Sequence, residues 1–210
     1  MSGFTFGICT QYADARKIQE VVSSIDRLYI PHYEILLVGG EKGAFPWITS
    51  TGHLRQIESN GWLPQKKNLI AQMAHFENLV LCHDYYVFDF EWYQSYLTFN
   101  EGVMWDICSN PQFLITGQRH FTDWVNWDDP SYPRYYSFGY NDWTHTKYQY
   151  ISGGFFLVKR DFLRENPLNE SLKPGDPEDV EWSLRVREKA LIRCNPYAKV
   201  YHNKIHRDVR

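Results

Sequence analysis

The interpretation of the fold starts from the stretch NLVLCHDYYVF, residues 78–88. Its apolar run at 79–82 is typical of a buried strand, and His83 and Asp84 follow that run at once. An imidazole and a carboxylate placed directly after a buried strand indicate a sheet edge that carries polar groups. The end of this strand is therefore the first candidate site.

Strands and helices alternate in the order predicted for the residues before this stretch. Residues 4–10 and 33–40 are strand candidates, and apolar residues recur between them at helical spacing: Ile18, Val21, Val22, Ile25 and Leu28. A second helix is expected to begin near Pro64 and to face inward with Leu69, Met73 and Phe76. This order predicts an α/β protein whose central sheet is mixed and mainly parallel, with helices on both faces.

In such sheets, ligands bind beyond the carboxyl ends of the strands. His83 and Asp84 follow one strand end, and Thr10, Gln11, Gly39 and Gly40 lie at two others. These residues are therefore expected to meet at one edge of the sheet.

The second half of the chain is less regular. Residues 89–100 and 175–190 predict helices, the latter with Asp176 as cap and Pro177 at the first helical position. Strands are expected within 112–116, 151–163 and 198–202, the second followed by a short helix. Between them, residues 118–150 hold eleven aromatic residues among thirty-three and predict a structured loop.

Composition narrows the class of protein. With 210 residues, 43% of them apolar, the chain can form one domain, residues 1–210. A net charge of −3 gives no basic surplus for nucleic acid. The sequence has no transmembrane run, and its four cysteines are far apart, so we expect a soluble protein with reduced thiols in the cytoplasm.

Four motifs, in this order, carry a resemblance to a known family: CHDYY (82–86), ISGGFF (151–156), PEDVEWSLR (177–185) and VYHNKIH (200–206). Together they resemble the GT-A nucleotide-sugar glycosyltransferases, most closely the family-2-like branch, over nearly the whole chain. The resemblance implies one Rossmann-like GT-A domain, with a nucleotide-binding half at about 1–90 and an acceptor-binding half at about 91–210.

The activity implied is transfer of a hexose-type sugar from a nucleoside diphosphate, UDP-sugar favoured, to a saccharide acceptor, with Mn²⁺ or Mg²⁺. A likeness to a multi-domain viral member of the family further implies one domain of a longer protein, acting in the host cytoplasm.

In this family an acidic motif holds the metal against the donor diphosphate, and a late histidine assists. Asp84 and His202 match these positions as metal ligands. The family's usual motif is Asp-x-Asp, but Cys82 stands at its first carboxylate, so His83 is a candidate to bind ribose or metal instead. A turn carboxylate and structural histidines are the alternatives. His202 and His206 also have zinc-pair spacing, but the glutamate that a hydrolytic zinc helix needs is absent.

Glu178 and Asp179 match the family's x-E-D motif. In an inverting transferase this aspartate accepts the proton of the acceptor hydroxyl, so Asp179 is the candidate catalytic base. Two acids in a first helical turn also suit the helix dipole without any catalytic role. A retaining enzyme would use the diphosphate itself as base.

The remaining candidates bind the donor nucleotide or the sugars. Gly153 and Gly154 allow close approach of backbone to a sugar or acceptor, although a strand bulge needs the same residues. The resemblance assigns nucleobase binding to the end of the first strand, at Thr10, Gln11 and Tyr12. It assigns diphosphate binding to the basic start of the second helix, at Lys66 or Lys67. Many relatives have an aspartate after the second strand, whereas this chain has Gly39 and Gly40.

The aromatic loop at 118–150 suits an acceptor site, because sugars offer apolar faces and polar edges. Plausible walls are Trp124, Trp127, Tyr136 and Trp143. Two other functions remain open: a non-catalytic saccharide-binding domain, and a sugar nucleotidyltransferase, whose glycine-rich loop after the first strand is not matched by CTQYADARK (9–17).

Overall fold

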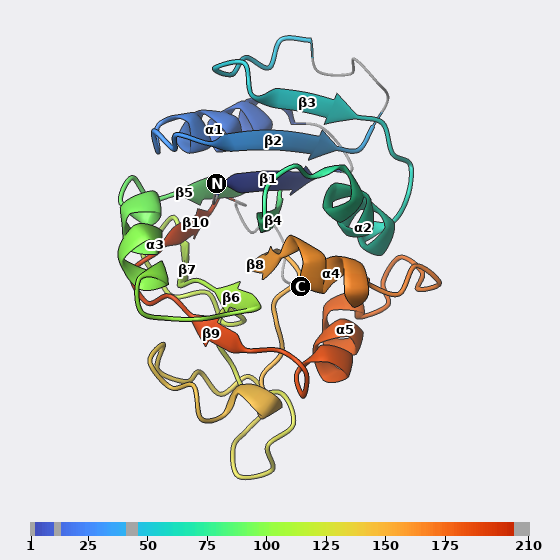
Figure 1. Ribbon diagram of the computed structural model, residues 1–210. Coiled ribbons are helices and arrows are strands. Elements are labelled where there is room, and N and C mark those ends of the chain that lie inside the picture. Colours follow the sequence, from blue (N-terminus) through green and yellow to red (C-terminus); the bar gives the residue numbers. More distant parts are fainter. Residues whose placement is uncertain (1–2, 11–13, 41–45, 204–210) are drawn as a thin grey trace.

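A seven-stranded sheet forms the centre of the protein in the computed structural model, which describes residues 3–10, 14–40 and 46–203 (Figure 1). Its strand order is β3-β2-β1-β4-β8-β6-β9. The strands are β1 (Phe4–Cys9), β2 (Tyr33–Val38), β3 (Leu54–Ile57), β4 (Asn78–His83), β6 (Ile107–Ser109), β8 (Phe155–Lys159) and β9 (Ile192–Cys194). β3, β2, β1 and β4 are parallel, whereas β8 runs antiparallel to both β4 and β6.

A second sheet of three short strands has the order β5-β10-β7. It contains β5 (Tyr86–Phe88), β7 (Gln112–Leu114) and β10 (Val200–His202). β5 follows β4 after a two-residue turn, so this sheet begins where the candidate site is expected. It brings the late strand β10 beside that turn.

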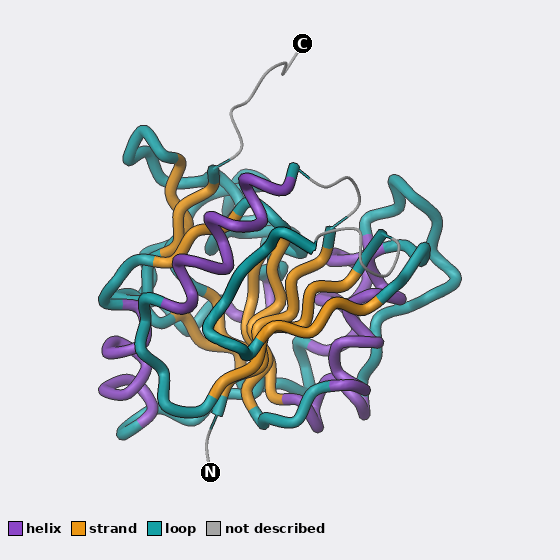
Figure 2. The backbone as a smooth tube through the Cα atoms, turned by 90° about the horizontal axis from the view of Figure 1, so that it is seen from above, coloured by secondary structure: helices purple, strands orange, loops and turns teal. Residues whose placement is uncertain are grey.

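Helices cover both faces of the central sheet (Figure 2). α1 (Ala15–Asp26) and α3 (Trp92–Asn100) pack on one face. α2 (Leu63–Met73), α4 (Arg160–Glu165) and α5 (Glu178–Val186) pack on the other. The loop between β7 and β8 contains only a short 3-10 helix, η1 (Thr146–Tyr148), and forms the lower part of the molecule in Figure 1.

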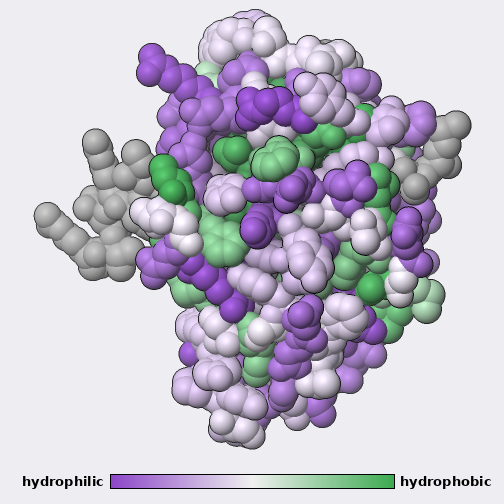
Figure 3. Space-filling model, turned by 90° about the vertical axis from the view of Figure 1, so that its left-hand side faces the viewer, coloured by the Kyte–Doolittle hydropathy of each residue, from purple (hydrophilic) through white to green (hydrophobic). Residues whose placement is uncertain are grey.

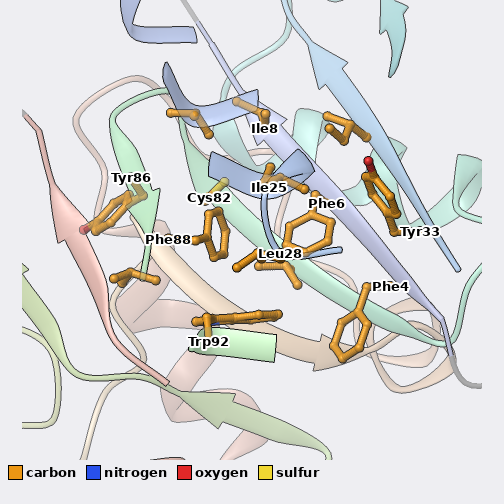
Figure 4. Packing of buried hydrophobic residues seen from close by; sticks show 14 of the residues in the cluster. Phe4, Phe6, Ile8, Ile25, Leu28, Tyr33, Cys82, Tyr86, Phe88 and Trp92 are labelled. Atoms are coloured by element: carbon orange, nitrogen blue, oxygen red, sulfur yellow. The ribbon is translucent and has the colours of Figure 1, made fainter. Parts of the chain in front are cut away.

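Aromatic rings dominate the core beneath α1 and α3 (Figure 4). Phe88 lies edge-on to Phe6 and to Trp92, with ring centroids 5.3 and 5.2 Å apart. Edge-to-face contacts of this kind add about 0.5–1.5 kcal/mol each beyond the burial of apolar area. They fix β5, and with it the turn that carries Asp84, against the central sheet.

The predicted fold class is confirmed, with differences in detail. Four strands were not predicted: β5, β6 and β9, which are only three residues long each, and β3, whose residues LRQI are all half-buried and lack an apolar pattern. Met73 does not face inward but is 39% exposed, since α2 buries Lys66 and Lys67 instead. α5 begins at Glu178 and has Pro177 at its cap position, while the Asp176 carboxylate accepts a hydrogen bond from the Lys173 amide and does not cap the helix.

The surface around α3 and the second sheet shows small apolar areas separated by hydrophilic ones (Figure 3). Among the helices of the described ranges, none is long and apolar enough to cross a membrane. All four cysteines are free and buried, as their spacing predicts.

Candidate functional site

The ends of β1, β2 and β4 meet the start of α2 in one cluster of polar groups. The Thr10 hydroxyl donates a hydrogen bond of 2.5 Å to Oδ2 of Asp84. Nζ of Lys66 donates to the carbonyl oxygen of Thr10. Gly39 has φ +139°, and a Cβ there would lie 2.1 Å from that same carbonyl oxygen. Only glycine fits this position, so Gly39 lets β2 and β1 carry their polar ends side by side.

Burial acts on the two charges of this cluster in opposite directions. It raises the pKa of the Asp84 carboxyl, although the hydrogen bond from Thr10 works against the rise. It also lowers the pKa of the Lys66 ammonium group. In each case the charged form is disfavoured by lost solvation. A cation beside Asp84 and an anion beside Lys66 would each compensate that loss, which suits a ligand carrying phosphate and metal.

His83, Tyr85 and His202 form a line of rings at the edge of the second sheet. Nδ1 of His83 lies 2.7 Å from the Tyr85 hydroxyl. The Tyr85 ring lies 4.5 Å from the buried ring of His202, measured between centroids. His202 also stacks on His120 of the long loop, with centroids 5.2 Å apart. β10 thus places His202 near the end of β4, with the Tyr85 ring between His202 and His83.

The described side chains do not form a closed metal cage. Within residues 3–10, 14–40 and 46–203 there is no group of three or more His, Cys, Asp or Glu that could hold an ion. Cys82 cannot replace the missing carboxylate, because its side chain is buried in the apolar core and burial raises its thiol pKa well above the usual value. A cation that takes most of its oxygens from substrate phosphates needs only one or two carboxylates. A single carboxylate at this position, that of Asp84, would therefore suffice for an ion that arrives with a diphosphate.

A buried ion pair joins α2 to the start of α5. Nζ of Lys67 lies 3.1 Å from Oε1 of Glu178, and the two side chains are only 1% and 9% exposed. Lys67 also lies over the ring of Phe156, 5.6 Å from its centroid. Lys67 was predicted to bind the diphosphate, and Glu178 was predicted to belong to the catalytic motif. In the structure these two side chains form an ion pair with each other.

Asp179 lies beside the glycines that precede β8. Its Oδ2 accepts a hydrogen bond of 2.9 Å from the Gly153 amide, and its Oδ1 accepts one from the Val180 amide. A Cβ on Gly153 would lie 2.8 Å from Oε1 of Glu178 and 2.9 Å from Cβ of Asp179. Gly153 is therefore needed for the approach of α5 to β8. The carbonyl of Gly154 accepts from the His83 amide, which connects this region to the β4 end.

No model of a known protein family and no curated protein matches the sequence. The crystal structure of S. aureus TarS 1-349 matches 97% of this chain with a TM-score of 0.68 at 13% identity. That of S. aureus TarS, and that of TarS 1-349 in complex with UDP-GlcNAc, give 0.69 and 0.67 over 97% and 99% of this chain, also at 13% identity.

The fold is the GT-A fold. This chain spans 60% of the TarS 1-349 chain and 37% of the longer TarS chain. The GT-A fold predicted from the motifs is thus confirmed across almost the whole chain, while those structures extend beyond it.

Within the GT-A fold, most of the predicted residues come together. Thr10, Lys66 and Asp84 share one cluster, and Gly153 lies against Asp179. Gln11, Tyr12 and His206 lie outside the described residues. Two contributors were missed, Tyr85 and His120. The adjacency of Tyr85 to Asp84 was a usable signal, whereas nothing in the sequence places His120 beside a histidine 82 positions later.

The predicted walls of the aromatic loop need correction. Trp124 is only 1% exposed, and its Nε1 donates to the carbonyl of Asp142, so it belongs to the core. Trp143 is half-buried between Phe99 and Arg193. A fully buried carboxylate, Asp123, lies in this loop and accepts hydrogen bonds from Arg119 and Tyr140.

Proposed function

We propose that the protein transfers a sugar from a nucleoside diphosphate, UDP-sugar favoured, to a saccharide acceptor. The observation that supports this most is the cluster of Thr10, Lys66 and Asp84 at the carboxyl ends of parallel strands. The hydrogen bond from the His83 amide to the Gly154 carbonyl connects this strand end to the region of Gly153 and Asp179, which supports donor and acceptor chemistry in one site. The match to TarS solved with UDP-GlcNAc and with UDP adds support for a UDP-linked donor.

In this proposal Asp84 would bind Mn²⁺ or Mg²⁺. His202 would be a further ligand of the metal or would contact the diphosphate. When bound, the cation neutralises charge that develops on the departing diphosphate. Lys66, whose pKa is lowered by burial, faces the same anion and gains from its charge. Thr10 and Gly39 keep these groups in place, and Gln11 and Tyr12 are proposed to bind the nucleobase.

Asp179 is proposed as the base that accepts the proton of the acceptor hydroxyl in an inverting reaction. Backbone amides of Gly153 and Val180 orient its carboxylate. An ionised carboxylate offers about four lone-pair sites, so two bonds leave capacity for a hydroxyl. Glu178 is proposed to position this base through its ion pair with Lys67 and not to take part in proton transfer.

The test uses thermal unfolding with UDP, GDP and their sugars, with and without Mn²⁺. A ligand at about a hundred times its Kd should add roughly 2.7 kcal/mol of stability. At about 2–4 °C per kcal/mol, the midpoint should rise by several degrees. We expect a shift with UDP that requires the metal and is lost in Asp84→Ala. Asp161→Asn, a change at a side chain that is 69% exposed, is the matched control.

The catalytic part is tested by release of UDP from a UDP-sugar. Asp179→Asn should retain the UDP-dependent shift and lose turnover. If no nucleotide shifts the midpoint, with or without metal, the proposal is wrong and the non-catalytic saccharide-binding function takes its place.

A further inference from the structure

Four aromatic residues of the loop between β7 and β8 gather beside Asp179. Tyr135 lies edge-on to Phe121, Trp127 and Tyr150, with ring centroids 5.8, 5.8 and 6.3 Å away. Trp127 and Tyr150 are 5.3 Å apart. We name this group the aromatic platform. Tyr150 is buried at its base, whereas Phe121 and Tyr135 are 60% and 43% exposed.

The aromatic platform is connected to both Asp179, the proposed base, and His202. Burial raises the pKa of the Tyr150 hydroxyl, and the nearby Asp179 carboxylate adds to the rise. Thr122, next to Phe121, lies with its hydroxyl 3.4 Å from that of Ser152, the residue before Gly153. His120, on the other side of Phe121, stacks on His202. The exposed rings are thus tied both to the proposed base and to the proposed diphosphate end.

The backbone holds the platform in a fixed arrangement. Tyr135 has φ +64°, a left-handed conformation that a bulky residue adopts only when its surroundings impose it. Its amide donates to the carbonyl of Asn126. The buried Asn126 side chain in turn donates to the carbonyls of Asp129, Tyr132 and Pro133. A ring held this way loses little freedom when a ligand stacks on it.

We propose that Phe121 and Tyr135, whose rings meet at 76°, form a corner in which a sugar ring of the acceptor packs on the face of one ring and the edge of the other, with its reacting hydroxyl directed to Asp179. This inference rests on the proposed function and names the acceptor subsite. Saccharide rings carry apolar C–H faces that pack on aromatic rings, while their hydroxyls need polar neighbours. The half-buried Asp179 carboxylate supplies such a neighbour, since its two bonds to backbone amides leave it acceptor capacity.

The experiment is saturation-transfer NMR with methyl glycosides of glucose, galactose, mannose and N-acetylglucosamine, in the presence of UDP and the diamagnetic ion Mg²⁺. At least one glycoside should bind the unchanged protein. Its Kd should rise about tenfold in Phe121→Ala and in Tyr135→Ala, which corresponds to about 1.4 kcal/mol. Phe121→Tyr and Tyr135→Phe keep a ring and should retain binding. Tyr197→Ala, at a ring that is 71% exposed between β9 and β10, is the control.

Two measurements separate failure of this inference from failure of the proposed function. If the unchanged protein binds no glycoside, or if the alanine variants bind as well as it does, the platform is not the acceptor subsite. The metal-dependent shift with UDP, recorded on the same variants, reports donor binding and folding independently. Loss of that shift in the unchanged protein would overturn the proposed function itself.

Discussion

Replacing Glu178 with alanine would leave the ammonium group of Lys67 buried without its partner. The Lys67 side chain is 1% exposed and 3.1 Å from Glu178, so water cannot take the place of the carboxylate without rearrangement. Breaking a buried pair from one side costs about 3–5 kcal/mol. For a domain of this length, at about 2–4 °C per kcal/mol, the midpoint of unfolding should fall by roughly 6–20 °C.

The same helix supplies the matched control. Glu181 pairs with Arg185 one turn on, but these side chains are 32% and 36% exposed. An exposed pair at this spacing contributes only about 0.3–0.5 kcal/mol, so Glu181→Ala should be nearly silent. The double variant Lys67→Met with Glu178→Gln removes both charges and should recover much of the loss, because an uncharged replacement of a buried pair is often neutral.

Urea unfolding followed by circular dichroism gives the stabilities of Glu178→Ala and Glu181→Ala. It also gives those of the unchanged protein, Lys67→Met, Glu178→Gln and their double variant, which together form a double-mutant cycle. The reasoning is refuted if Glu178→Ala costs no more than Glu181→Ala, or if the Lys67 and Glu178 changes are additive. Additivity would mean that the two side chains do not interact, and that the carboxylate belongs to ligand binding instead.

Three further outcomes follow from single positions. Burial alone would raise the pKa of Glu34, but hydrogen bonds from the His75 amide and the Thr5 hydroxyl outweigh it and lower the pKa. Its stabilisation is then full above the unfolded pKa of about 4.3 and is lost as pH falls through the lower folded value. Urea unfolding should therefore show a deficit for Glu34→Gln at neutral pH that disappears in strong acid. Gly39→Ala should cost about 1–3 kcal/mol in the same assay, because its φ of +139° is unfavourable for alanine, and should abolish the UDP-dependent shift. Asp123→Asn weakens charged hydrogen bonds worth roughly 1.5–3 kcal/mol, and hydrogen exchange should speed up in the loop at 118–150 before it does in β1 and β4.

The first half of the fold was predictable because its elements have regular apolar patterns. α1 buries the residues that its spacing selects, and β1, β2 and β4 are mainly apolar and buried. The inward face of α2 was not predictable in this way. Its buried lysines depend on Thr10 and Glu178, which lie 56 and 111 positions away, and no local pattern carries that information.

The candidate site was predictable where a residue follows a strand directly. Thr10, Gly39 and Asp84 are such residues, and the sheet alone brings them together. The aromatic loop differs, since its exposed and buried rings follow one another in no regular order. Exposure there is decided by a hydrogen-bonded frame, so that Trp124 is buried while Phe121, three residues earlier, is exposed.

The hydrogen bonds around Asp123 affect which changes of sequence that loop can accept. Asp123 accepts hydrogen bonds from Arg119, from the Trp124 amide and from the Tyr140 hydroxyl, and Arg119 also donates to the carbonyls of Trp124 and Phe138. These five residues belong to the loop itself, and one further donor to Asp123, the Gln112 amide, lies in β7. Because most of this support travels with the loop, the segment could be exchanged or diversified while the strand ends around Asp84 stay as they are. Acceptor preference and donor preference would then be inherited separately.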